Sequence, residues 1–135
     1  MDAINLRALS DEYRLILDHL GCLYEKSVSG PVDAATLAEL HRLGAALETR
    51  FAHERDLMRD TRYPEAGRHE EMHGLIRRFL DKLAVAAERH DDGLLRQEIP
   101  FLLHLVLDHR AVEDRCLDDF MDGLETDTTS PDRRS

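Results

Sequence analysis

Apolar side chains recur every three or four positions along most of the chain, which is the spacing of helices with one buried face. The first such stretch runs from about Leu6 to Ser27 and stops at Ser29-Gly30-Pro31. Its apolar positions are Leu6, Leu9, Tyr13, Ile16, Leu17, Leu20, Leu23 and Tyr24. A second stretch follows Asp33, a residue type that caps helix N-termini, and ends before Tyr63-Pro64. We expect one helix in each stretch.

Two further helical stretches follow in the second half of the chain. The third is predicted from near Glu65 to about Arg89, where Asp91-Asp92-Gly93 interrupts the pattern. The fourth is predicted to extend from about Leu94 to Phe120. Because proline breaks a helix interior, we expect Pro100 to lie in the first turn of this helix, or the helix to begin later.

Four helices of about 20 residues with short connections predict an all-α fold, an up-down-up-down four-helix bundle. We assign the bundle to residues 1–123. Residues 124–135 are polar and are predicted to form a disordered tail. Bundles of this kind serve many unrelated functions, so the function has to be read from particular residues.

The charge balance narrows the choice of partners. The chain of 135 residues has 28 acidic and 18 basic side chains, a net charge of −10, and 42% apolar residues. It shows no basic stripe with interleaved aromatics, so we expect neither nucleic acid nor an anionic membrane as a partner. No apolar run approaches the roughly 20 residues of a membrane helix, and the N-terminal segment lacks the apolar core of a signal peptide. We therefore expect a cytoplasmic protein.

Cys22 and Cys116 lie far apart in the sequence and do not form a metal-binding pair. We expect both to be small buried hydrophobic residues in a reducing compartment. A disulfide between them would contradict the predicted bundle, because the helical rise places them at distant levels.

Histidines are the first candidates for chemistry, since the chain has eight of them. His69 and His73 are four positions apart on the third predicted helix, so both imidazoles can reach one metal ion. They share a stripe with Ala66, Ile76 and Leu80 and should face the core. The spacing alone is weak evidence, because a solvated histidine pair has the same spacing.

Two other helices place polar groups on their apolar stripes. On the second, Glu54 follows Arg50 by one turn, which fits either a buried ion pair or a metal ligand. On the fourth, His109 continues the apolar stripe, whereas Asp114 lies roughly 140° further round an ideal helix. The spacing alone would not select Asp114 as a partner of His109.

Taken together, these segments resemble bacterial hemerythrins. The stretch RFAHERDLMRDTRYPEAGRHEEMHGLIRRFL resembles the family's central segment, His-Phe-x-x-Glu-Glu-x-Leu-Met, then Tyr-Pro, then His-x-x-x-His. The matching residues are Phe51, Glu54, Leu57-Met58, Tyr63-Pro64, His69 and His73. HRAVED, with His109 and Asp114, matches the family's His-x-x-x-x-Asp. The resemblance covers roughly residues 6 to 120.

The resemblance implies a hemerythrin-like fold and a non-haem diiron site, of which five ligand positions are retained. One iron would take His69, His73 and His109, and the carboxylates of Glu54 and Asp114 would bridge the two irons. The other iron normally takes one histidine from the first helix and one from the second. This chain has Arg50 at the second-helix position and, in LSDEYRLIL, Tyr13 at the first-helix position.

The departure suggests two ways to complete the site. An arginine cannot bind a metal, but its charged planar fork suits carboxylates. We therefore expect the Arg50 guanidinium to take the place of the second metal, to pair with Glu54 and Asp114, and to leave a site for one ion of Fe, Zn or Mn. Alternatively, two metals remain, with Tyr13 as a phenolate ligand and His53 completing the set.

Three classes of function follow from this sequence. The first is a non-enzymatic metal-binding domain for a small ligand such as O2 or NO, in binding or in redox or NO sensing, acting as a homodimer or through a separate signalling partner. The family's usual O2 carriage needs a pair of irons, so a single iron would favour sensing. The second is a weak iron-dependent peroxidase or NO-consuming enzyme, for which Tyr13 is the one redox candidate near the metal. The third is a metal-free interaction domain.

Overall fold

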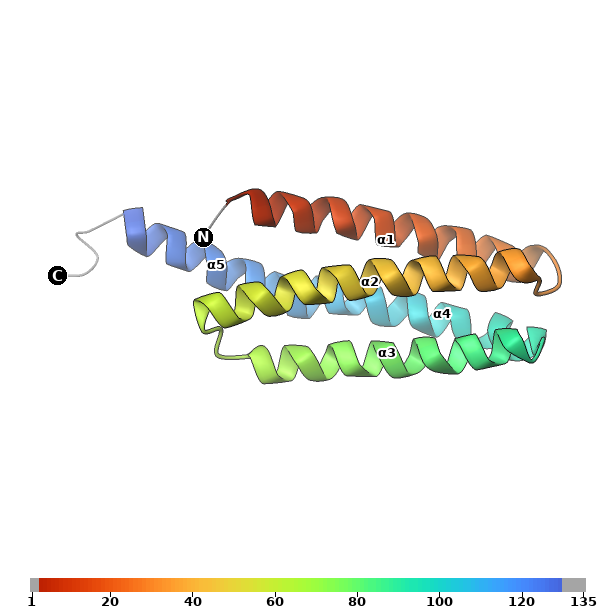
Figure 1. Ribbon diagram of the computed structural model, residues 1–135. Helices are drawn as coiled ribbons and strands as arrows, with labels where there is room; N and C mark the ends of the chain where they lie inside the picture. The colour runs from red at the N-terminus through yellow and green to blue at the C-terminus, as the bar shows by residue number, and fades with distance from the viewer. Residues whose placement is uncertain (1–2, 130–135) are drawn as a thin grey trace.

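The computed structural model describes residues 3–129 and, within them, the side chains of residues 11–124. Its elements are α1 (Ala3–Ser29), α2 (Ala34–Thr61), α3 (Ala66–Glu88), α4 (Asp92–Asp108), the π-helix η1 (His109–Asp114) and α5 (Arg115–Thr129). Helix α1 contacts α2 and α4, and α3 contacts the same two helices, so the chain forms a helical bundle (Figure 1). Helices α4, η1 and α5 follow one another without a break. The described residues contain no strand, and the predicted all-α class is confirmed.

The connections between the helices are short and capped. Asp33 is the N-cap of α2, as predicted: the Thr36 backbone N–H donates to Asp33 Oδ1 at 3.0 Å. Helix α2 ends at Thr61, and its C-cap Arg62 has a φ of 54°, in the left-handed region. The Tyr63 backbone N–H then donates to the carbonyl of Met58 at 2.9 Å. This cap sets the tight connection to α3 that brings the C-terminal half of α2 beside the first turns of α3.

The expected position of Pro100 is wrong. Helix α4 begins at Asp92, with Asp91 accepting a hydrogen bond from the Leu94 N–H at 3.1 Å, and Pro100 lies in its interior. The proline removes the N–H that would have bonded to the carbonyl of Arg96. Both residues are on the exposed face of α4, where water can satisfy that carbonyl, so the helix continues.

The predicted boundary of the tail also needs correction. Helix α5 continues past Gly123 to Thr129, so residues 124–129 are helical instead of a disordered tail. Residues 130–135 lie outside the described part of the chain.

Both cysteines are exposed, which contradicts the prediction that they are buried. The helical period explains the difference. On α1 the buried positions flanking Cys22 are Leu20 and Leu23, and on α5 Leu117 takes the buried position next to Cys116. The thiols are free, and no disulfide joins them.

The core consists of two apolar clusters separated by polar residues. The larger cluster includes Phe51, Ile76 and Val106, and the smaller one consists of Leu57, Met58, Tyr63, Leu117 and Met121. Near the boundary between them, α2, α3 and η1 contribute the buried polar residues Arg50, Glu54, His69, His73, His109, Glu113 and Asp114. A polar layer inside a bundle is costly unless its members bond to one another or to a ligand.

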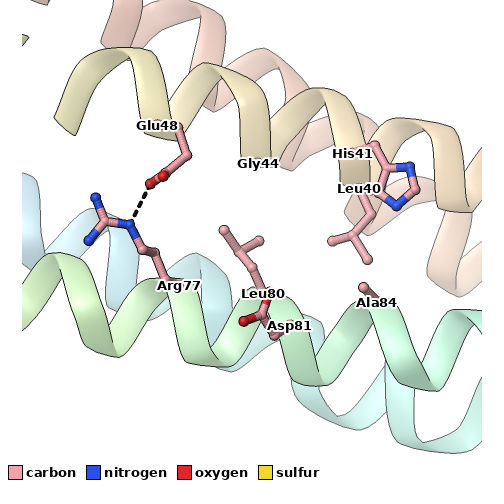
Figure 2. A pocket seen from close by; sticks show the side chains of 8 residues that line it. All are labelled: Leu40, His41, Gly44, Glu48, Arg77, Leu80, Asp81 and Ala84. Carbon is pink, nitrogen blue, oxygen red and sulfur yellow. Dashed lines mark hydrogen bonds and ion pairs between the residues drawn. The ribbon is translucent and has the colours of Figure 1, made fainter. Parts of the chain in front are cut away.

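A groove lies on the surface between α2 and α3 (Figure 2). It encloses about 340 Å³ and is lined by Leu40, His41, Gly44, Glu48, Arg77, Leu80, Asp81 and Ala84. Arg77 Nε lies 2.6 Å from Glu48 Oε1 across one end. None of the polar-layer residues lines the groove, so it is not a pocket of the candidate site. In the described residues no helix has both the length and the apolar character to cross a membrane.

Candidate metal centre

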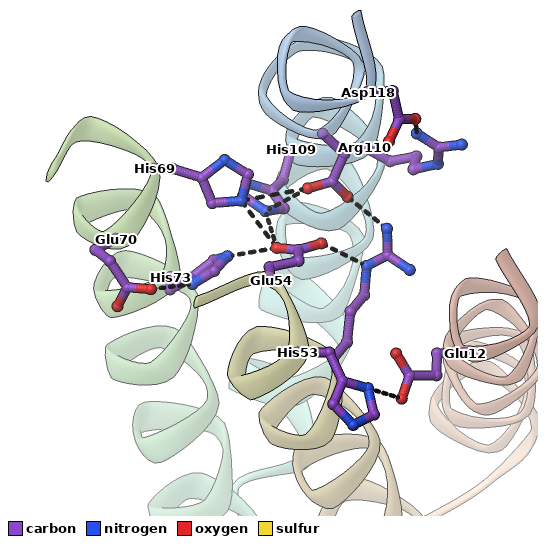
Figure 3. Close-up of polar contacts among 11 residues, drawn as sticks. Glu12, His53, Glu54, His69, Glu70, His73, His109, Arg110 and Asp118 are labelled. Carbon is purple, nitrogen blue, oxygen red and sulfur yellow. Dashed lines mark hydrogen bonds and ion pairs between the residues drawn. The ribbon is translucent and has the colours of Figure 1, made fainter. Parts of the chain in front are cut away.

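Four buried side chains from three elements converge at one point of the polar layer. Glu54 comes from α2, His69 and His73 from α3, and His109 from the start of η1 (Figure 3). Each residue offers one ligand atom, and these atoms lie within 4.8 Å of one another. In the part of the chain that the structure describes, this is the one group of at least three histidine, cysteine or carboxylate side chains with metal-ligand spacing.

The centre of the group is one carboxylate oxygen, Glu54 Oε1. The Nε2 atoms of His69 and His73 both lie 2.8 Å from it, and His109 Nε2 lies 3.6 Å from it. All three imidazoles therefore present the same ring nitrogen to the same point. His73 is held there by Phe51, whose ring stacks on the imidazole with centroids 3.9 Å apart.

Asp114 joins this group because the backbone forms a π-helix between His109 and Asp114. Asp114 Oδ1 lies 3.1 Å from His109 Nε2 and 3.4 Å from His69 Nε2. The i→i+5 hydrogen bonding of a π-helix widens the turn, so residues five apart come to the same face. On the ideal α-helix assumed in the sequence analysis, Asp114 lies roughly 140° from His109, too far round for both side chains to face one point. The signal that selected it was the resemblance of HRAVED, and the structure supplies the physical reason.

Arg50 bonds to the outer oxygens of both carboxylates. Its Nε lies 2.9 Å from Glu54 Oε2 and its Nη2 donates to Asp114 Oδ2 at 2.9 Å. The expected ion pairs of Arg50 are therefore present, and both are buried. Each carboxylate is shared: one oxygen faces the histidines and the other faces the guanidinium. This arrangement leaves Oε1 and Oδ1 as the carboxylate atoms that can bind an ion among the histidines.

The electrostatics of the layer depend on mutual pairing. Burial alone would raise the pKa of Glu54, but the three nearby histidines, of which His69 and His73 lie at hydrogen-bond distance, and the charge of Arg50 hold it well below its usual value. Burial likewise opposes the ionised form of Asp114, yet the neighbouring His109 and His69 lower its pKa. Burial would lower the pKa of His109, and the two carboxylates raise it to about 9. The two carboxylates are thus balanced by the Arg50 guanidinium and by a second positive charge, which a protonated His109 supplies when no cation is bound.

The donor set fits a transition-metal ion. Three imidazole Nε2 atoms and carboxylate oxygens are ligands that Fe, Zn and Mn accept. Neighbouring ligands of an ion bound at about 2.0–2.2 Å stand roughly 3–3.5 Å apart, close to the separations from Glu54 Oε1. His109 Nε2 and Asp114 Oδ1 are buried and lie 3.1 Å apart, but their geometry is not that of a hydrogen bond. An ion at this point would bond to both and take over the charge of the His109 proton.

Tyr13 and His53 do not belong to the convergent group. The half-buried Tyr13 ring has the guanidinium carbons of Arg50 and Arg110 at 5.4 Å and 5.3 Å from its centroid. Burial raises the pKa of its hydroxyl, which opposes a phenolate, although both arginines act the other way. His53 is half exposed, and its Nδ1 lies 2.6 Å from Glu12 Oε2 (Figure 3). The structure therefore places neither side chain among the four converging ligand atoms.

Sequence reasoning missed two carboxylates next to the site. Glu113 is buried in η1, and its Oε1 lies 3.2 Å from Arg68 Nη2. Glu70 Oε1 lies 3.3 Å from His73 Nδ1, the nitrogen that faces away from the convergent group. The spacing of Glu70 and His73, three residues apart on one helix, was a usable signal for the second contact.

Comparisons with protein-family models, with curated proteins and with solved structures find no match to this chain. The chemistry of the site therefore rests on its own geometry. That geometry is a buried His/Glu group that can hold a metal ion, inside a helical bundle.

Proposed function

We propose that this chain is a hemerythrin-like, non-haem metal-binding protein with an up-down-up-down bundle, and that the bound metal is iron. The observation that carries this proposal is the convergence of three histidine Nε2 atoms on Glu54 Oε1. The order of these residues along the helices is that of the family resemblance. The donor set also accepts Zn or Mn, so the metal has to be identified by experiment.

The site is proposed to hold one ion per chain. His69, His73 and His109 with Glu54 would be its ligands, and Asp114 Oδ1 is close enough to complete the set. Arg50 supports this stoichiometry, because it already binds the outer oxygens that a second ion would need. An arginine stays protonated and offers no lone pair to a metal.

The proposed role is binding or sensing of a small ligand or of redox state. A single iron supplies one-electron chemistry and binding of NO, whereas reversible O2 carriage of the hemerythrin type uses two irons. The chain's own residues would hold the ion in a dry layer between two apolar clusters, with Phe51 stacked on His73. We therefore favour redox or NO sensing over O2 delivery as the role of the site.

The test is metal content per chain, measured by elemental analysis on protein purified without chelator, together with a visible spectrum. We expect about one iron per chain and no oxo-bridge bands. His73→Ala should lose the metal, whereas His41→Ala, at an exposed position of α2, should keep it. Two irons with oxo-bridge bands would contradict the one-ion site, and an equal metal content in both variants would contradict the assigned ligands.

A metal-free interaction domain is the second candidate, and the Arg50 ion pairs favour it. They show that two buried carboxylates already have a cation without any metal. The two candidates differ in their response to a chelator. A bound ion stabilises the fold by mass action, about 2.7 kcal/mol at a free concentration 100 times Kd. A melting temperature unchanged by chelator, in protein with no bound metal, would favour the metal-free domain.

A further inference from the structure

The three site histidines differ at the ring nitrogen that faces away from the convergent group. His73 Nδ1 lies 3.3 Å from Glu70 Oε1 (Figure 3). The Nδ1 atoms of all three are buried, and in the described residues none of them makes a hydrogen bond. Among the three imidazoles of this described site, His73 is the one whose outer nitrogen lies within ion-pair distance of a carboxylate.

Glu70 is itself held in place from the neighbouring helix. The same oxygen, Oε1, lies 3.6 Å from the Nε atom of Arg55 on α2. Arg55 directly follows Glu54 in the sequence, so α2 supplies both the carboxylate at the centre of the site and the cation that faces Glu70. The contacts Arg55–Glu70 and Glu70–His73 thus link the surface between α2 and α3 to the convergent group.

The chemistry of imidazole ligands explains what this contact can do. When Nε2 binds a metal, the ring proton resides on Nδ1 and can be donated outward. A carboxylate that accepts this proton fixes the ring orientation and tautomer and makes Nε2 a better ligand. Glu70 lies where such an acceptor is needed, three residues before His73 on α3.

We propose that Glu70 is a positioning residue for the metal ligand His73, that Arg55 supports it, and that together they set how tightly the site holds its ion. This inference rests on the proposed metal binding. It adds to the site two residues that do not touch the ion, and it makes His73 the most strongly oriented of the three histidine ligands.

A simpler account of the contact is an i,i+3 pair that stabilises α3 by about 0.2–0.5 kcal/mol. The two accounts predict different results. If the pair only stabilises the helix, removing Glu70 lowers the stability of the metal-free protein and leaves metal affinity nearly unchanged. If Glu70 is a positioning residue, removing it lowers metal affinity and has little effect on the metal-free protein, because most of its benefit appears when Nε2 is bonded to a metal.

The experiment compares Glu70→Ala and Glu70→Gln with Glu71→Ala, which removes the adjacent exposed glutamate of the same helix. Zn²⁺, which is redox-inert, is titrated into each metal-free protein by calorimetry. We expect Glu70→Ala to weaken Zn²⁺ binding by about 10–100-fold. Glu70→Gln, which keeps an acceptor oxygen, should recover part of this loss, and Glu71→Ala should bind like the wild type.

Two further measurements complete the test. Metal-free melting temperatures of Glu70→Ala and Glu71→Ala should agree, and ring-nitrogen NMR of the Zn²⁺-loaded wild type should show His73 protonated at Nδ1. Equal affinities in Glu70→Ala and Glu71→Ala would overturn the positioning role while leaving metal binding intact. A wild type that binds no Zn²⁺ at this site would instead overturn the proposed function.

Discussion

Arg50 Nη2 and Asp114 Oδ2 lie 2.9 Å apart in the core, although 64 positions separate the two residues in the sequence. The contact joins α2 to the end of η1, and the same guanidinium pairs with Glu54 one turn further along α2. A buried cation shared by two buried carboxylates determines how much negative charge remains for an ion among the histidines. Under the proposed metal binding, we expect the number of bound ions to depend on this one side chain.

Replacing Arg50 with His should raise the metal content from about one towards two ions per chain. The substitution removes the guanidinium from Glu54 Oε2 and Asp114 Oδ2 and adds an imidazole ligand beside them. Metal content is measured by elemental analysis after loading with excess iron. Arg59→His is the matched control, since it adds a histidine at an exposed position of the same helix. No gain in Arg50→His over this control would count against the proposed role of Arg50.

Replacing Arg50 with Met should lower the free energy of unfolding of the metal-free protein by about 3–5 kcal/mol. The reason is that Glu54 and Asp114 would both lose their buried counter-charge. Denaturant unfolding in the presence of chelator measures the change. Adding Asp114→Asn should restore part of the loss, because it removes one of the uncompensated charges. If the losses of unfolding free energy caused by Arg50→Met alone and by Asp114→Asn alone simply add up in the double variant, the two side chains do not stabilise each other.

Most of the helical pattern could be predicted because each helix has a clear apolar period. Asp33 marked the start of α2 correctly, since a side-chain cap is a local signal. The convergence of His69 and His73 also followed from local spacing, four residues on one face. Their meeting with Glu54 and His109 required the order of the helices in the bundle, which no single segment specifies.

The wrong predictions concern positions where the backbone conformation or the exposure to solvent overrides what the residue type or spacing indicates. Asp114 reaches the site through a π-helix, and no residue type in HRAVED marks such a turn. Pro100 is tolerated inside α4 because its face is exposed, and the sequence does not state exposure at one position. Cys22 was predicted to be buried because of its residue type, whereas the helical period of α1 makes Leu20 and Leu23 the buried positions.

Pro100→Ala should stabilise the protein. Proline in a helix interior is about 3 kcal/mol less favourable than alanine, and part of this difference is offset because proline also restricts the unfolded chain. We expect a gain of about 1–2 kcal/mol, measured by denaturant unfolding at fixed metal content. Pro31→Ala is the control, because Pro31 lies between α1 and α2 and breaks no helical hydrogen bond. A loss of stability in Pro100→Ala would contradict this account of the proline.

Cys22 and Cys116 should both react with a thiol reagent in the native protein. Both are exposed, so labelling needs no unfolding. We expect two thiols per chain to be modified at the same rates with and without a low concentration of denaturant. Cys22→Ser and Cys116→Ser assign the two reactions. A thiol that reacts only after unfolding would show that its helix packs against another surface in solution.

Acid should reduce stability partly through Glu39, which is buried between α1 and α2. Its Oε1 lies 2.6 Å from His19 Nδ1, and its Oε2 lies 2.9 Å from Arg42 Nη2. Burial would raise the pKa of Glu39, but these two partners lower it below its usual value. A folded-state pKa below the unfolded value means that the stabilisation is present above about pH 4.5 and is lost as the pH falls through the folded-state pKa.

In Glu39→Gln the free energy of unfolding should therefore fall less steeply than in the wild type below about pH 4.5. Glu25→Gln, at an exposed position of α1, should follow the wild-type curve. Parallel curves for Glu39→Gln and the wild type would mean that the His19–Glu39–Arg42 contacts add no stability that depends on the ionised carboxylate.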